Sequence, residues 1–173
     1  MRHTQYTIRN TQYEKGFSLV EVLLALAITG MLLAAVAVAF NASIINYREN
    51  EDIFKATNSA RQALFRITTQ LRTAGAVDPN SPNNECSLIT AGADDITYRF
   101  NAADNTLYLI TNDDLLDSDY VLCDNVAAMT FAKGTVTEDS QTKVKSVQIS
   151  MTVQRGNIQK TVSAAAVIRR NLN

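Results

Sequence analysis

A single carboxylate, that of Glu21, lies inside the apolar run from Phe17 to Phe40. A helix over this run is about 36 Å long at about 1.5 Å per residue, which is enough to cross a hydrocarbon core about 30 Å thick. A charged side chain in such a span costs roughly 2.5–3.5 kcal/mol on insertion scales, so its presence points to a function. The chemistry available to it is ion pairing in a medium of low dielectric constant, and Glu21 therefore needs a cationic partner.

Two cysteines, Cys86 and Cys123, follow the apolar run. The positive excess before it (Arg2, Arg9 and Lys15 against Glu14) places the N-terminus in the cytoplasm and sends the rest of the chain across the membrane. In that oxidising compartment the two cysteines are predicted to form a disulfide, which stabilises a loop of this length by about 4 kcal/mol in the chain-entropy model. Two free buried thiols are the alternative.

An acidic segment, Asn112 to Asp119, is the candidate for metal binding. Its four carboxylates are those of Asp113, Asp114, Asp117 and Asp119. Hard oxygen ligands at this spacing suit calcium, but the segment lacks the central glycine and the terminal glutamate of an EF-hand loop. Solvation is the usual fate of an acidic loop, so no metal and no other cofactor is favoured.

Several function classes are excluded by composition. The one histidine, His3, precedes the apolar run, so nothing after it can build a Ser/His/Asp triad, a Cys/His pair or a histidine-ligated zinc site. No phosphate-binding glycine loop is present. The formal net charge is −1 and no basic cluster is interleaved with aromatic residues, so we expect no nucleic-acid partner. The sequence therefore predicts no enzymatic activity.

The helix is predicted to continue beyond the apolar run as an amphipathic half. Apolar residues recur at helical spacing from residue 53 to residue 74, namely Ile53, Ala56, Ala60, Leu64, Ile67, Leu71 and Ala74. Gly75 and the last-turn Arg72 mark the end of one helix from Phe17 to Ala74. Beyond a loop at 78–84, the apolar residues alternate with polar ones, as in Ile96, Tyr98 and Phe100 or in Val147, Ile149, Met151 and Val153. The turn Arg155-Gly156-Asn157 predicts a hairpin of Ser146–Gln154 with Ile158–Ile168. The fold class is α+β, a long helix packed on an antiparallel sheet.

The residues around the apolar run also carry a family resemblance. A polar leader ending in Lys15-Gly16, then Phe17, an acidic residue at position 21 and an unbroken apolar helix resemble the cleavage and methylation signature of type IV pilins and type II secretion pseudopilins. The resemblance implies that a prepilin peptidase cuts between Gly16 and Phe17 and that the new amine of Phe17 is methylated. It further implies that Glu21 pairs with the Phe17 amine of a neighbouring subunit.

The same resemblance divides the chain into four parts: a leader over 1–16, an apolar, membrane-spanning helix half over 17–40, an amphipathic half over 41–75 and a β-rich globular part over 76–173. Major pilins commonly carry a helix-kinking proline where this chain has Val38, so the resemblance favours a minor pilin or a pseudopilin. Major pseudopilins hold calcium in a C-terminal loop, which adds to the interest of the acidic segment.

The predicted function is that of a structural subunit, anchored in the bacterial inner membrane with its C-terminal part outside, that enters or caps a type IV pilus-like filament. Its partners are other pilin or pseudopilin subunits and the prepilin peptidase. A pseudopilin of the type II secretion system and a ligand-binding or adhesive module at a filament tip are the alternatives. Two plainer interpretations of the apolar run remain: a secretory signal peptide cut after Ala37-Val38-Ala39, and a signal anchor in which Glu21 has no role.

Overall fold

A computed structural model of the chain describes residues 16–112, 119–138 and 140–169. It divides into two compact units, which meet between Ile45 and Asn46. One helix, α1, runs from Leu19 to Thr73 and so contributes to both units. The predicted helix, Phe17 to Ala74, is confirmed to within two residues at each end.

In the first unit, the apolar side chains of α1 are exposed and are not covered by any of the described residues. Phe17, Leu19 and Met31 are 81%, 76% and 74% exposed, and the other large apolar residues of this stretch are exposed too. An 18-residue window of this helix has a mean hydropathy of 2.7 and is 0% buried, so by length and composition the helix can cross a membrane. An apolar surface of this extent has to be covered by lipid or by other helices.

In the second unit, one stripe of α1 is buried against the β-structure. Its members are Ile53, Ala56, Ala60, Ala63, Leu64, Ile67, Thr68 and Leu71. They recur every three or four residues because α1 turns once per 3.6 residues, so a single face meets the sheets. Every residue of the predicted stripe is buried, including Ala74 just beyond the helix.

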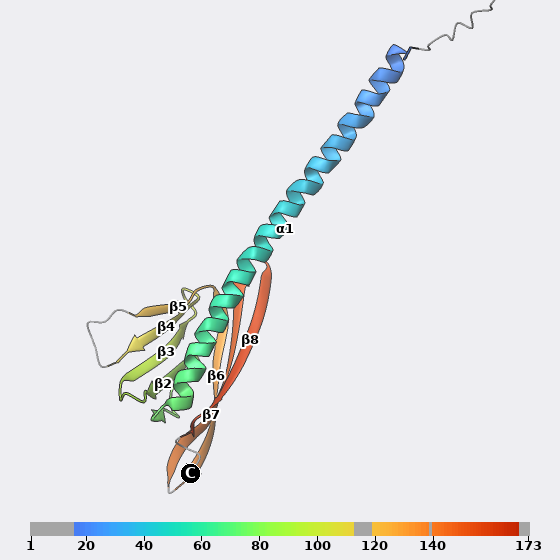
Figure 1. Ribbon diagram of the computed structural model, residues 1–173. Coiled ribbons are helices and arrows are strands. Elements are labelled where there is room, and N and C mark those ends of the chain that lie inside the picture. Colours follow the sequence, from blue (N-terminus) through green and yellow to red (C-terminus); the bar gives the residue numbers. More distant parts are fainter. Residues whose placement is uncertain (1–15, 113–118, 139, 170–173) are drawn as a thin grey trace, which may run out of the picture. The chain divides into compact units, whose positions relative to one another are not determined.

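The strands form two antiparallel sheets rather than the one sheet predicted. The first has the order β1-β2-β3-β4-β5 and the second the order β6-β7-β8 (Figure 1). The strands are β1 (Ala76–Val77), β2 (Glu85–Ile89), β3 (Asp95–Asn101), β4 (Thr106–Thr111), β5 (Tyr120–Cys123), β6 (Val126–Glu138), β7 (Gln141–Arg155) and β8 (Ile158–Val167). Within the second unit, α1 lies with the five-stranded sheet to one side of it and β8 to the other (Figure 1).

The alternating residues of both sheets supply the rest of the core. Tyr98, Leu107 and Phe131 are fully buried, as are the β7 residues Val147, Ile149, Met151 and Val153. This confirms the predicted period of two, because successive side chains of a strand point to opposite faces. The predicted hairpin is confirmed by the pairing of Arg155 with Ile158, across a turn in which Gly156 has a φ of 55°. That left-handed conformation is easily reached only without a Cβ.

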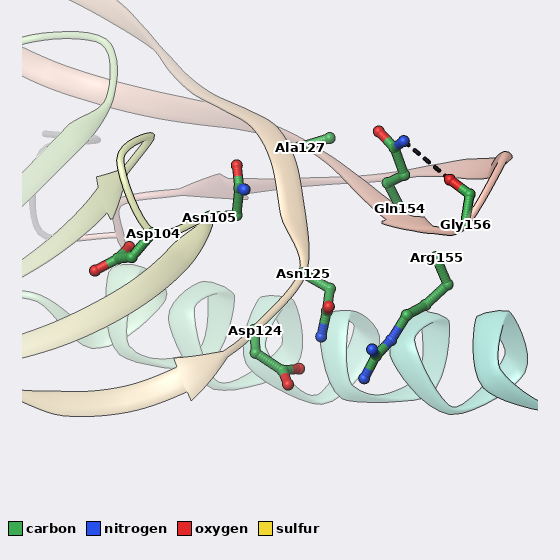
Figure 2. A pocket seen from close by; sticks show the side chains of 8 residues that line it. All are labelled: Asp104, Asn105, Asp124, Asn125, Ala127, Gln154, Arg155 and Gly156. Atoms are coloured by element: carbon green, nitrogen blue, oxygen red, sulfur yellow. Dashed lines mark hydrogen bonds between the residues drawn. The ribbon is translucent and has the colours of Figure 1, made fainter.

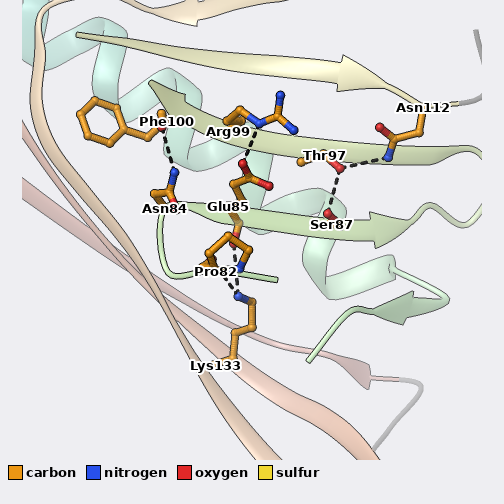
Figure 3. A network of polar contacts seen from close by, with 9 residues as sticks. All are labelled: Pro82, Asn84, Glu85, Ser87, Thr97, Arg99, Phe100, Asn112 and Lys133. Carbon is orange, nitrogen blue, oxygen red and sulfur yellow. Dashed lines mark hydrogen bonds and ion pairs between the residues drawn. The ribbon is translucent and has the colours of Figure 1, made fainter. Parts of the chain in front are cut away.

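Polar contacts join the two sheets (Figure 3). The Lys133 ammonium on β6 donates to the backbone carbonyls of Ser81 at 2.6 Å, Pro82 at 3.2 Å and Glu85 at 3.2 Å. The Phe131 amide donates to the Asn83 carbonyl at 2.7 Å. The loop that leads from the helix into β2 is thereby fixed along the outer edge of β6.

Candidate functional site

The start of α1 is the site that the sequence singles out, and the structure shows how its backbone is arranged. The Ser18 hydroxyl accepts a hydrogen bond from the Glu21 amide at 3.2 Å. The Ser18 carbonyl accepts from the amides of Glu21 at 3.1 Å and Val22 at 3.2 Å. Ser18 is therefore the N-cap residue, and it satisfies amides that have no partner inside the helix. Glu21 falls in the first turn, where a negative charge also complements the helix dipole.

Gly16 and Phe17 precede the cap, lie outside any helix or strand and are exposed. A Cβ built on Gly16 meets nothing within 4 Å, and Gly16 is not among the residues with positive φ. Nothing in this chain's own fold therefore requires glycine at that position. The Phe17 side chain is 81% exposed and makes no core contact. Both residues are accessible to an outside agent.

The Glu21 side chain extends from an exposed stretch of helix, and no cation lies against it in the described part of the chain. The hydroxyl of Thr29, also in the apolar stretch, donates to the Ala25 carbonyl at 2.7 Å and is thereby satisfied within the helix. Glu21 differs from Thr29 because its charge cannot be neutralised by its own helix. Within the described residues of one subunit, this carboxylate is therefore unpaired.

The predicted disulfide between Cys86 and Cys123 is wrong for this structure, in which both cysteines are free and buried. Cys86 lies on β2 and Cys123 on β5, with β3 and β4 between them. Three strand spacings of about 4.8 Å separate their backbones by about 14 Å, whereas a disulfide requires Cα atoms within about 7 Å. Burial raises the pKa of each thiol to about 11, so both stay protonated and unreactive near neutral pH.

The acidic segment is only partly described, because Asp113, Asp114 and Asp117 lie outside the described residues. Asp119, which precedes β5, is exposed. Among the described residues no group of three or more Asp, Glu, Cys or His side chains could hold a metal ion. Calcium binding by the whole segment stays a prediction.

A polar pocket of about 450 Å³ lies where three turns meet (Figure 2). Its lining comes from the turns β3–β4, β5–β6 and β7–β8 and comprises Asp104, Asn105, Asp124, Asn125, Ala127, Gln154, Arg155 and Gly156. Backbone bonds hold the turns together, from the Val126 amide to the Asn105 carbonyl at 2.8 Å and from the Gln154 amide to the Asn125 carbonyl at 2.9 Å. The Asp104 carboxylate accepts from the Tyr108 hydroxyl at 2.8 Å, which raises the pKa of Tyr108. The pocket holds no nucleophile paired with a base, so its geometry is that of a turn junction.

The residues that couple α1 to the sheets were not predicted from the sequence. Gln70 on α1 accepts a hydrogen bond from the hydroxyl of Tyr98 on β3. Arg66 lies over the ring of Tyr120 on β5, 5.8 Å from its centroid. The sequence gives only a weak indication of these contacts, because polar residues beside an apolar stripe, such as Gln70 and Arg66, usually face solvent.

The comparison with protein families assigns the start of the chain. Residues 11–37 match the prokaryotic N-terminal methylation motif. No curated protein and no solved structure gives a significant match. The motif, with a long N-terminal helix packed on antiparallel sheets, supports a type IV pilin-like prepilin. It implies processing by a prepilin peptidase and assembly with other pilin subunits, and the apolar helix fits an anchor in a membrane.

Proposed function

We propose that this chain is a minor pilin, a structural subunit that is stored in the inner membrane and then enters or caps a type IV pilus-like filament. The observation that carries the proposal is the Glu21 carboxylate, which has no cationic partner among the described residues and lies four residues after Phe17, on the stretch of α1 whose apolar side chains are exposed. A filament supplies both missing partners. Neighbouring helices cover the apolar side chains, and the Phe17 amine of the next subunit pairs with the carboxylate.

The alternative of a type II secretion pseudopilin uses the same chemistry. A tip-located binding module is the second alternative, and the turn-junction pocket of about 450 Å³ would be its ligand site. The exposed anchor favours assembly over ligand binding as the primary role, because the pocket lacks a convergent set of buried polar groups. We further propose that the protein has no catalytic activity, since the methylation motif belongs to structural proteins.

The mass of the mature protein tests the first step. Protein extracted from membranes is expected to begin at Phe17 and to be one methyl group heavier than the unmodified peptide. A start near Phe40 would support a secretory signal peptide instead, and an intact Met1 would support an unprocessed anchor.

Replacement of the carboxylate tests the second step. Glu21→Leu should insert at least as well as the parent protein and still be cut at Gly16, yet be lost from filaments, measured by co-purification with partner subunits. Thr29→Leu is the matched control, since the Thr29 hydroxyl is satisfied by the Ala25 carbonyl and should be dispensable. Equal recovery of Glu21→Leu and Thr29→Leu with the partners would overturn the role of the carboxylate.

A further inference from the structure

Charge is strongly segregated along the second half of the sequence. Arg99 is the only basic residue between Ala76 and Asp124, a stretch rich in aspartate. No acidic residue occurs between Ile53 and Thr73 on α1, and none occurs from Gln141 to Asn173, the stretch that includes β7 and β8. The chain, whose net charge is −1, therefore contains an acidic zone over residues 76–124 and a basic zone made of residues 53–73 and 141–173.

Two arginines in the basic stretch of α1 face different neighbours. Arg66 faces β5 of the acidic zone, where it lies over the Tyr120 ring. Arg61 instead lines a groove of about 420 Å³ beside β8. The described ion pairs do not neutralise one zone with the other, because Glu51–Lys55 lies within the helix and Glu85–Arg99 within the five-stranded sheet.

The groove beside β8 has the character of a binding surface. Its lining is Arg61, Leu64, Phe65, Thr68, Val162, Ser163 and Ala164. The Phe65 ring is 74% exposed, although it belongs to a helix whose neighbouring face is fully packed. β8 is also the last strand of its sheet, so one row of its backbone groups is open, and the exposed Lys160 lies on the same strand. We call this surface the basic groove.

A matching surface lies on β5, the last strand of the other sheet. Tyr120 and Val121 are 60% and 51% exposed, and the exposed carboxylates of Asp119 and Asp124 flank them. We call these four residues the acidic edge. Each surface thus has an apolar centre with a charged rim. The acidic edge stays net negative because the carboxylates of Asp119 and Asp124 outnumber the one cation beside it, Arg66 over the Tyr120 ring, so the two surfaces are of opposite sign, as in complementary protein interfaces.

We propose that the acidic edge of one copy docks on the basic groove of a second copy of this chain. A molecule that carries both halves of a complementary pair on different sides forms a heterologous contact, which repeats without closing and so builds a filament. The inference rests on the proposed function, since it names the surfaces by which globular parts meet once the anchors are side by side. A two-fold pairing of β8 with β8 would instead bring Lys160 and Arg61 of both copies to one interface, which like charges disfavour.

Site-specific cross-linking in membranes of cells that express two tagged full-length copies tests the contact. One copy carries Val121→Cys and the other Ser163→Cys, and a short bismaleimide joins them; the buried Cys86 and Cys123 provide the unreactive background. We expect a cross-link between the two copies and little within either set alone. Cross-linking confined to Ser163→Cys with itself would overturn the proposal in favour of a two-fold contact.

Charge reversal then separates this contact from the anchor. Arg61→Glu should lower the cross-link yield about two- to fivefold, and Asp124→Lys on the partner copy should restore it. Arg48→Glu, the same change at an exposed position of the same helix, is the control and should leave the yield unchanged. If subunits co-purify in filaments but do not cross-link, the contact is wrong and the proposed function stands. If neither occurs, the proposed function fails as well.

Discussion

At the scale of single residues, the fold gives no reason for a glycine at position 16, whereas the proposed processing does. A glycine is usually needed for a positive φ or a close approach, and Gly16 has neither. Glu21 is the converse case, because its charge opposes membrane insertion and finds no partner inside the described chain. The proposed explanation of both residues is that other proteins act on this one.

Gly16→Val is therefore expected to leave the fold and membrane insertion intact and to block cleavage. The added side chain enters open space in the subunit, whereas it must clash in a peptidase site that receives a residue without a side chain. Mass spectrometry should show the leader retained. Gly30→Val is the control, because a Cβ at Gly30 also meets nothing within 4 Å, and this variant should be cut normally. Normal cutting of Gly16→Val would remove the argument for Gly16.

At the scale of elements, hydrophobic periodicity predicted which face of α1 and which face of β7 is buried. The stripe from Ile53 to Leu71 and the β7 residues Val147 to Val153 are buried as the 3.6- and two-residue periods require. The pairing of one strand with another could not be predicted from periodicity. The split into two sheets depends on where β5 leaves the first sheet and β6 begins the second, with only two residues between them, and apolar periodicity within a strand does not show which neighbour the strand pairs with.

The cysteine prediction failed for that reason. Compartment and number favour a disulfide, but strand order decides whether two cysteines can meet, and two intervening strands keep Cys86 from Cys123. At the candidate site, the match of residues 11–37 to the methylation motif is local and needs no knowledge of strand order, and the roles of Gly16, Phe17 and Glu21 stay predictions. The groove beside β8 could not be predicted, because it depends on tertiary packing. In the sequence, Phe65 is only a helix residue next to the buried stripe.

The three hydrogen bonds that Lys133 donates to carbonyls of Ser81, Pro82 and Glu85 (the Lys133 clamp) are expected to stabilise the contact between the two sheets. Lys133→Met removes three hydrogen bonds from a charged donor to the loop carbonyls, and it should lower the free energy of unfolding by about 1–3 kcal/mol. Denaturant titration of the detergent-solubilised protein, followed by near-ultraviolet circular dichroism of its tyrosines, measures the change. Lys160→Met, on an exposed strand position, should alter stability by less than about 0.5 kcal/mol. Equal effects of the two variants would show that the clamp is dispensable.

At the scale of the whole molecule, the core between α1 and the sheets contains ionisable groups that must stay neutral. Burial raises the pKa of the Cys86 and Cys123 thiols from 9.0 to about 11, and burial raises the pKa of the Tyr98 hydroxyl from 10.0 to about 12. Each group binds its proton more tightly in the folded than in the unfolded protein. Its contribution to stability is therefore fully present below the unfolded pKa and is lost as the pH rises through the folded pKa.

The protein should consequently lose stability steeply between about pH 9 and pH 12, by at most about 3 kcal/mol for each thiol over its two-unit shift. Denaturation midpoints across this range measure the loss. The double variant Cys86→Ala/Cys123→Ala should be somewhat less stable at pH 8, because two buried sulfurs are removed, but should show a shallower decline above pH 9. Tyr98→Phe should flatten the decline between about pH 10 and pH 12, at the cost of the hydrogen bond to Gln70. Identical slopes of stability against pH in the parent protein and the cysteine variant would mean that the thiols are not buried between α1 and the sheets. A thiol titration of the denatured, unreduced protein would then show whether the cysteines had been oxidised.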